Sequence, residues 1–365
     1  MNTAAVSQGV ATRAPTLPAL TGVRFFAAMA VLLFHYGAGF AVRSHAPSPV
    51  THLLHNGFLG VSLFFVLSGF IITYSHFAQA MPAPAIRRFY WARIARIYPV
   101  YLLALLLALP VLTKPLPLLN ALAVLTMTQA WTTPASHLGV SWVMQAWTLS
   151  IEAAFYILFP FYWPVVRRLG RAGTIGLAIA CAAFIVAFGV PTVRPEGVTV
   201  PLLGQQAWTL IPLFRMAEFT YGMAICQIFM RWPLFSRQRP INARLASALE
   251  IGLALGLIAV LVTADSPQAK GVFTVLTGLF ILVTAHDAGV VSRLMATPVL
   301  LLLGGASYGI YILQQPVHSL CTALLRAPYD QVISPIVTIA GAIAVYLFVE
   351  QPARRLLMGL VPRPD

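Results

Sequence analysis

The stretch LPALTGVRFFAAMAVLLFHYGAGF, residues 17–40, decides the fold class of this chain. Its length suits a transmembrane helix, which needs roughly 20 mostly apolar residues. Two polar side chains, Arg24 and His35, interrupt the apolar run. A charge at mid-bilayer costs about 2.5–3.5 kcal/mol even on insertion scales, so we expect these residues to serve a function. They lie about three helical turns apart, which places both on nearly one face, ~16 Å apart along the axis.

The composition of the whole chain agrees with a membrane protein. Of its 365 residues, 59% are hydrophobic and 9% are charged, whereas soluble domains have about 25% charged residues. The mean hydropathy is +0.84. The net charge of +14 does not indicate nucleic-acid binding, because the Lys and Arg residues lie in short loops between apolar runs, as positive-inside topology requires. The three cysteines lack the paired spacing of zinc sites, so we expect no metal.

The apolar runs predict an all-α polytopic membrane protein with about ten transmembrane helices plus one short re-entrant or half-length segment. The short segment is the run 117–132, which is too brief for a comfortable crossing. The ten longer runs centre on residues 18–40, 57–79, 91–112, 144–164, 172–191, 208–230, 246–264, 271–290, 297–321 and 332–350.

Charge decides whether the short run crosses the membrane. If it does not cross, the arginines of the loops after the second, fourth, sixth and tenth runs all fall on one side. The loops of the other side then hold Glu196, Asp265 and Asp330. Because Lys and Arg mark the cytoplasmic side, we expect both termini to be cytoplasmic in a bacterial plasma (inner) membrane, with an uncleaved first span. This divides the chain into a cytoplasmic tail 1–16, a membrane domain 17–352 and a cytoplasmic tail 353–365.

Histidine is the side chain best suited to act as a base near neutral pH. His35 either has that role or makes a hydrogen bond between helices, and the arginine on its face favours the functional role. Other histidines, at positions 45, 52 and 55, fall in the first outer loop. With no carboxylate or cysteine nearby in the sequence, we expect a solvated loop there rather than a metal site.

Arg93 and Arg96 are spaced i, i+3 at the cytoplasmic start of the third run and therefore share a helix face. Arg87 and Arg88 precede them, and binding to lipid phosphates explains this first pair adequately. The second pair lies deeper, among apolar and aromatic residues. Planar guanidinium groups suit a phosphate-rich ligand such as a nucleotide cofactor.

Glu152 lies in the middle of a span, where a carboxylate must pair with a cation or stay protonated. Arg24 and Arg215 are its candidate partners. Arg215 and Glu218 are three residues apart, and we expect them to neutralise each other.

Two further features receive structural interpretations. Glu350 is expected to pair locally with Arg354 at a helix end. The small residues Gly57, Gly60 and Gly69 are expected to allow close helix packing.

Six segments, in order along nearly the whole chain, resemble the acyltransferase 3 family of integral-membrane O-acyltransferases. They are LTGVRFFAAMAVLLFH (20–35), GFLGVSLFFVLSGFIITY (57–74), RRFYWARIARIYPVY (87–101), WTLSIEAAFYILFP (147–160), ASYGIYILQQP (306–316) and VEQPARR (349–355).

The resemblance implies about ten spans and transfer of an acyl group from a cytoplasmic acyl-CoA to an extracytoplasmic carbohydrate. By the same resemblance, the family's arginine and histidine pair corresponds to Arg24 and His35, its R-x-x-R element to Arg93 and Arg96, and its mid-span glutamate to Glu152. The chain departs from the family at residues 314–316, Gln-Gln-Pro, where many members carry a histidine, so no second base is assumed there. It also ends soon after the last span, without the esterase-like domain that some members carry.

These observations predict a membrane O-acetyltransferase that moves an acetyl group from acetyl-CoA to a sugar hydroxyl of a lipid-linked or growing exopolysaccharide. In this interpretation Arg93 and Arg96 bind the cofactor, while His35, Arg24 and Glu152 are catalytic. The expected partners are acyl-CoA, a polysaccharide or lipid-linked oligosaccharide, and membrane lipid, with no nucleic acid. A xanthan-type acceptor is expected by family habit, and lipopolysaccharide O-antigen and peptidoglycan remain alternatives. A transporter or flippase of lipid-linked glycans, and a structural scaffold, are the rival classes.

Overall fold

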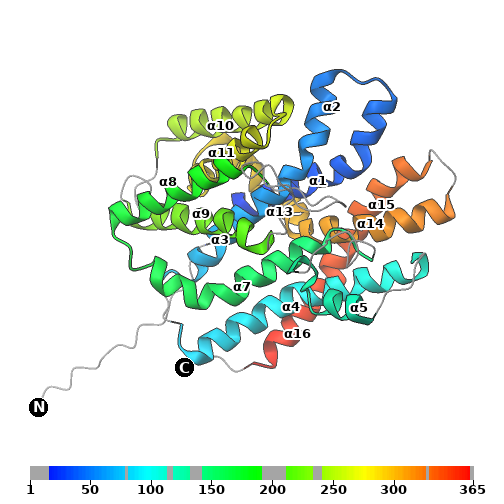
Figure 1. Ribbon diagram of the computed structural model, residues 1–365, viewed down its shortest axis with the longest axis horizontal. Coiled ribbons are helices and arrows are strands. Elements are labelled where there is room, and N and C mark those ends of the chain that lie inside the picture. Colours follow the sequence, from blue (N-terminus) through cyan, green and yellow to red (C-terminus); the bar gives the residue numbers. More distant parts are fainter. Residues whose placement is uncertain are drawn as a thin grey trace, which may run out of the picture.

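The computed structural model describes residues 16–78, 81–112, 118–131, 142–190, 211–232, 241–325 and 329–361, and all regular structure within these ranges is helical (Figure 1). The elements are α1 (Pro18–Arg43), α2 (Ser48–His55), η1 (Asn56–Leu59), α3 (Gly60–His76), α4 (Ala83–Ala108), η2 (Leu109–Val111), α5 (Leu118–Leu125), η3 (Gln129–Trp131), α7 (Ala146–Val166), α8 (Arg171–Phe188), α9 (Ile211–Arg231), α10 (Ala243–Thr263), α11 (Pro267–Thr284), α12 (Val290–Met295), α13 (Pro298–Gly305), α14 (Ser307–Leu324), α15 (Tyr329–Val345), the π-helical η4 (Tyr346–Glu350) and α16 (Gln351–Gly359).

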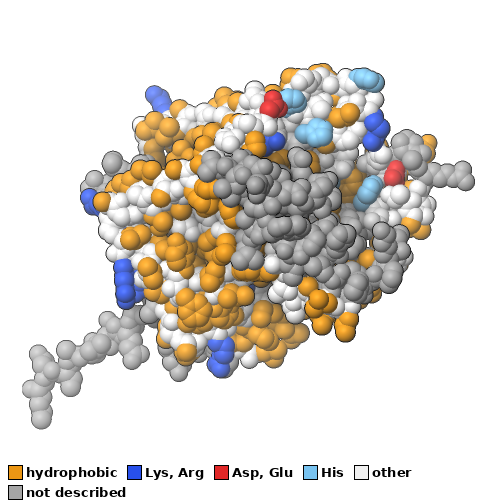
Figure 2. All heavy atoms as spheres, in the orientation of Figure 1, with side chains coloured by type: hydrophobic (Ala, Val, Ile, Leu, Met, Phe, Trp, Pro, Cys, Tyr) orange, Lys and Arg blue, Asp and Glu red, His pale blue; other side chains and the backbone are white. Residues whose placement is uncertain are grey.

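The predicted fold class is confirmed: the chain is an all-α, multi-pass membrane protein. Within the described ranges, eight helices are long and apolar enough to cross a bilayer. Each of the ten predicted runs falls on helix, but α9 and the α13–α14 pair are not among the eight. The first of these carries the charged Arg215 and Glu218, and the second contains Gln314 and Gln315. Large apolar side chains cover the outside of the bundle (Figure 2), as a lipid-facing surface requires.

Hydrogen bonds of side chains show which helix ends lie together at each end of the bundle. At one end, Arg43 Nη2 donates to Gln331 Oε1 at 2.9 Å, joining the end of α1 to the start of α15. At the other end, Trp91 Nε1 donates to the carbonyl oxygen of Leu357 at 2.6 Å, joining α4 to α16. Figure 2 shows basic side chains along the left and lower edges and also at the upper right, where most acidic and histidine side chains lie.

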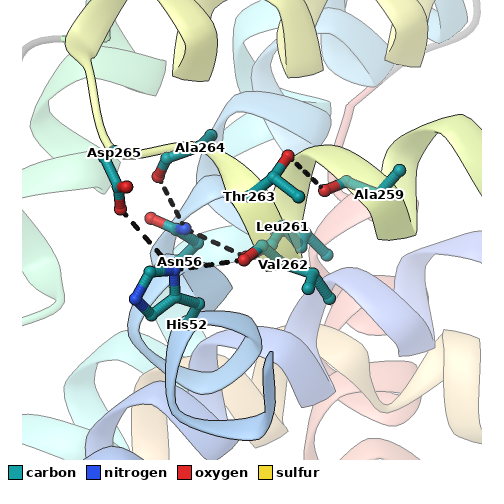
Figure 3. Close-up of polar contacts among 8 residues, drawn as sticks. All are labelled: His52, Asn56, Ala259, Leu261, Val262, Thr263, Ala264 and Asp265. Carbon is teal, nitrogen blue, oxygen red and sulfur yellow. Dashed lines mark hydrogen bonds and ion pairs between the residues drawn. The ribbon is translucent and has the colours of Figure 1, made fainter. Parts of the chain in front are cut away.

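The first outer connection is exposed, as expected, but it is helical rather than an irregular loop. It folds as α2, and η1 then leads into α3. Asn56 Nδ2 donates to the carbonyl oxygens of Leu261 and Ala264, each at 3.0 Å. His52 Nδ1 lies 3.6 Å from Asp265 Oδ1 (Figure 3). The carboxylate was not apparent from the local sequence because it comes from the distant α10–α11 connection. The contact also places these two predicted outer loops at the same end of the bundle.

The short run 117–132 is confirmed as a half-length element. It forms α5 and η3, and α5 is about 12 Å long at 1.5 Å per residue, far short of a bilayer core of about 30 Å. Tyr98 and Tyr101 of α4 donate to carbonyl oxygens at the end of α5, at 2.8 and 2.7 Å. These bonds satisfy backbone that would otherwise be unpaired inside a membrane. Residues 132–141, which follow this element, lie outside the described residues.

Glycines allow helices to cross closely, as predicted for the 57–69 segment. A Cβ at Gly69 would lie 2.0 Å from the Phe219 carbonyl oxygen of α9, and Gly57 and Gly60 abut α1 in the same way. About one helical turn before Arg24, a Cβ at Gly304 would lie 1.9 Å from the carbonyl oxygen of Thr21. A substitution at Gly304 would therefore push α13 away from the turn of α1 that precedes Arg24.

Candidate active site

A cavity of about 60 Å³ lies inside the bundle where α1, α3, α4, α7 and α14 meet. Apolar side chains of α3, α4 and α7 form part of its wall. The remaining wall is polar, which is costly within a membrane unless those groups are used. The polar lining residues are Arg24, Arg96, Thr148, Glu152, Tyr156, Tyr308 and Tyr311. Three of the five predicted site residues therefore come together at one cavity.

Arg24 reaches this cavity from α1. Among the described residues, its guanidinium has no hydrogen bond or ion pair, and it interacts electrostatically with Arg96, Glu350 and Glu152. Close approach of two guanidinium groups is unfavourable by itself, so the two carboxylates offset part of the repulsion. A cation held without a direct partner is available to a negatively charged or polarisable ligand.

Glu152 faces the same cavity from α7, but its carboxylate is hydrogen-bonded by hydroxyl groups. Tyr156 Oη, one helical turn later, donates to Glu152 Oε1, and Ser68 Oγ of α3 donates to the same oxygen at 3.4 Å. We had expected Arg24 or Arg215 as the partner. Arg24 shares the cavity without an ion pair to Glu152, and Arg215 is occupied elsewhere.

Arg215 and Glu218 neutralise each other, as their spacing predicted. The distance from Arg215 Nη1 to Glu218 Oε1 is 2.5 Å, and both side chains are almost completely buried. Ser62 Oγ of α3 donates to Glu218 Oε1 at 3.0 Å, and Arg215 lies over the ring of Phe65. Arg215, Glu218 and Ser62 therefore hold α9 against α3, and none of the three lines the cavity.

Arg93 and Arg96 share a face of α4, as predicted. Arg96 lines the cavity, and the guanidinium of Arg93 packs over the rings of Phe89 and Tyr156 at 5.5 and 5.6 Å. Arg93 Nε is buried without a hydrogen-bond partner. The predicted pair of cations therefore lies beside the cavity, near the end of the bundle where the basic loops gather.

Glu350 is a member of this cluster that the sequence analysis assigned to local pairing with Arg354. It is 7% exposed, and its Oε2 has no hydrogen-bond partner. Its electrostatic interactions with Arg96 and Arg24 are stronger than that with Arg354. Glu350 ends η4, and such π-helical segments are frequent at functional sites. Its place in the segment VEQPARR was the only sequence signal, because its interactions with Arg96 and Arg24 form only after folding.

His35 does not line the cavity. Its side chain is exposed and packs edge-on against Phe34, with ring centroids 4.9 Å apart. On α1 it lies ~16 Å beyond Arg24, toward the end of the bundle that carries α2. The structure therefore gathers the other predicted residues and leaves His35 separate from them, on the same helix.

His318 is a histidine that the sequence analysis overlooked, although it falls inside the run 297–321. It belongs to α14, and its ring packs edge-on against Tyr36, with centroids 5.0 Å apart. The residue next to His35 in the chain is thus in contact with a second imidazole. The described residues contain no group of histidine, cysteine or carboxylate side chains that could hold a metal ion.

Comparison with known proteins gives a consistent relationship. The family model Acyl_transf_3, described as an acyltransferase domain, matches residues 17–349. Acyltransferase MdmB of Streptomyces mycarofaciens is 30% identical over 232 residues, which cover 59% of this chain and 58% of the relative. Peptidoglycan O-acetyltransferase OatA of Listeria monocytogenes is 25% identical over 374 residues, covering 93% and 56%. O-acetyltransferase OatA of Staphylococcus aureus is 23% identical over 383 residues, covering 93% and 57%. The chain spans a little over half the length of these relatives. No solved structure matches.

Proposed function

Because this chain belongs to the acyltransferase 3 family, we propose that it is a membrane O-acetyltransferase that takes an acetyl group from cytoplasmic acetyl-CoA. The acceptor in this proposal is a sugar hydroxyl of a lipid-linked or growing exopolysaccharide outside a bacterial inner membrane. The names of the Listeria and Staphylococcus relatives describe O-acetyl transfer, which supports the reaction class. The observation that carries the proposal is the cavity that combines Arg24, Arg96 and Glu152, with Arg24 on the same helix as His35.

The arginine cluster is the proposed donor site. Arg93 and Arg96, beside and at the cavity, are the guanidinium groups proposed to bind the phosphates of a CoA thioester, and the N–H of Arg93 Nε has no hydrogen-bond acceptor. A cavity of about 60 Å³ is well below the roughly 300–1,000 Å³ of pockets that enclose drug-sized ligands, so it suits the small acyl end of the donor. The nucleotide would then lie outside the cavity, against the basic end of α4.

In the proposed reaction, the acceptor hydroxyl oxygen bonds to the thioester carbonyl carbon, and the carbon–sulfur bond breaks. His35 takes the hydroxyl proton, and the CoA thiolate leaves and gains a proton. Arg24 lines the acyl path between the donor site and His35, while Glu152 offsets the arginine charge from its hydroxyl-bonded position. A general base typically contributes 10²–10⁴-fold. Because His35 lies ~16 Å beyond Arg24 along α1, the thioester end of the donor must extend past Arg24 before its carbonyl carbon meets the hydroxyl that His35 deprotonates.

The rival proposal is a transporter or flippase of lipid-linked glycans. It also accounts for polar residues within the membrane, but it does not require the carboxylate, arginine and tyrosine groups to converge on one small cavity. A transporter leaves no covalent label on the glycan.

The test is acetyl transfer from radiolabelled acetyl-CoA to polysaccharide isolated from the source cells, with the purified protein in nanodiscs. We expect label on the polysaccharide with wild type, and loss of transfer in Arg24→Ala and His35→Ala at matched protein amounts. Arg171→Gln is the control, because Arg171 stacks on Trp232 away from the cavity. Absence of label with wild type, or wild-type transfer by either alanine variant, would contradict the proposal.

A further inference from the structure

A second polar cluster lies where α14 and α15 run side by side, apart from the cavity (Figure 1). His318 Nδ1 lies 3.2 Å from Ser334 Oγ, and Thr322 Oγ1 donates to Asp330 Oδ2 at 3.2 Å. His318 and Thr322 are i, i+4 on α14, and Asp330 and Ser334 are i, i+4 on α15, so two polar helix faces meet. Tyr36 of α1 packs against His318 at their edge.

The cluster contains a buried acceptor that has no donor. Asp330 is 6% exposed, and its Oδ1 has no hydrogen-bond partner. An ionised carboxylate can only accept hydrogen bonds, and a buried acceptor left unpaired costs about 1–3 kcal/mol. Its place in the first turn of α15 favours a negative charge there. That placement does not account for the unpaired oxygen, or for the histidine and tyrosine gathered beside it.

The position of the cluster relates it to the acceptor side of the proposed reaction. Tyr36 follows His35 directly, and its hydroxyl donates to the carbonyl oxygen of Gln314 on α14. The Arg43–Gln331 contact places the start of α15 at the end of the bundle opposite the basic loops. The cluster therefore lies at the end of the bundle predicted to be outside, and Tyr36 at its edge is one residue from the predicted base on α1.

We propose that Asp330, His318 and Tyr36 form a subsite for a hydroxylated sugar ring of the acceptor. Asp330 Oδ1 accepts a hydrogen bond from one hydroxyl, and His318 bonds a neighbouring one through its second ring nitrogen. The ring of Tyr36 supplies an apolar surface of the kind that combines with a few polar groups in binding sites. A neighbouring hydroxyl is thereby presented to His35. This inference rests on the proposed acetyltransferase function and names the site that holds its acceptor.

The test separates binding of the acceptor from binding of the donor. Using the nanodisc protein and the isolated polysaccharide, the apparent KM for polysaccharide and for acetyl-CoA is measured for wild type, Asp330→Asn and His318→Gln. Asparagine keeps the shape of Asp330 and a partner for Thr322 but loses the anionic acceptor. The matched control is His52→Gln, because His52 is a partly buried histidine at the same end that contacts a carboxylate without adjoining His35 (Figure 3).

We expect Asp330→Asn to raise the KM for polysaccharide by about tenfold, the equivalent of one charge-assisted hydrogen bond. The KM for acetyl-CoA and the thermal midpoint should match wild type, and His52→Gln should change neither KM. If wild type transfers acetyl but both cluster variants keep the wild-type KM for polysaccharide, the subsite is wrong and the function stands. A lowered thermal midpoint with both KM values unchanged would show a purely structural cluster. If wild type transfers no acetyl, both the proposed function and the proposed subsite are wrong.

Discussion

Arg24 and Glu152 face one cavity from α1 and α7, yet the carboxylate is bonded by Tyr156 and not by the guanidinium. This arrangement keeps a negative charge close enough to offset the arginines without using up a donor of Arg24. A direct ion pair would hold both groups in the resting state and compete with a thioester for the guanidinium. The tyrosine hydroxyl is therefore the group that separates the two charges.

Tyr156→Phe tests this separation. Without the hydroxyl, Glu152 keeps only the 3.4 Å bond from Ser68 and can turn toward the arginines. We expect the rate of acetyl transfer to fall about tenfold, comparable to losing one charge-assisted hydrogen bond. The control is Tyr90→Phe, since Tyr90 of α4 donates to the carbonyl oxygen of Ile157 on α7, the helix that carries Tyr156. Equal rates in the two variants would contradict the role given to Tyr156.

Arg96→Lys tests the donor site. Lysine keeps the charge but lacks the planar fork that bonds phosphate in two places. We expect the KM for acetyl-CoA to rise about tenfold, the cost of one such bond, while the KM for polysaccharide stays at the wild-type value. Arg171→Lys serves as the control at the same end of the bundle. A rise in the KM for polysaccharide alone would place Arg96 on the acceptor side instead.

Glu350→Gln tests whether this carboxylate offsets the arginine cluster. Removing its charge leaves Arg24 and Arg96 with less compensation, so small anions should bind there more strongly. We expect pyrophosphate to inhibit acetyl transfer at a concentration about fivefold lower than for wild type, a shift of about 1 kcal/mol. Glu350→Asp should restore the wild-type inhibition. Identical inhibition of wild type and Glu350→Gln would show that Glu350 does not offset the charge of the arginines.

The Arg215–Glu218 pair makes a prediction about stability alone. Glu218→Ala leaves Arg215 buried without its carboxylate, and breaking such a pair costs about 3–5 kcal/mol. We expect a clearly lower thermal midpoint in nanodiscs. The double variant Arg215→Met/Glu218→Leu should recover most of the loss, because it removes both charges together. A double variant as unstable as Glu218→Ala would show that specific hydrogen bonds, such as that from Ser62, contribute most of the stability at this site.

The sequence predicted best where the relevant contacts are local. The i, i+3 spacing of Arg215 and Glu218 identified a real ion pair, and that of Arg93 and Arg96 identified a shared helix face. Apolar run lengths identified the helices and the half-length element at 117–132. Each of these depends on helical geometry, which spacing along the chain encodes directly.

Contacts between distant helices could not be predicted from spacing along the chain. The Glu152 partner lies on its own helix, but choosing Tyr156 over Arg24 requires knowing where α1 and α7 meet. Asp265 reaches His52 from a loop far along the chain, and Glu350 joins the arginines through the π-helical turn η4. His318 was missed because a lone histidine near the end of an apolar run carries no spacing signal, although Tyr36 packs against it in the structure.

The central claim is that Arg24 and His35 serve one reaction whose donor and acceptor lie on opposite sides of the membrane. The direct measurement is acetyl transfer in proteoliposomes, with radiolabelled acetyl-CoA supplied only outside and polysaccharide sealed only inside. Molecules inserted with their arginine-rich end outward should label the enclosed polysaccharide, and His35→Ala should not. Label that appears only when donor and acceptor share a compartment would contradict the account.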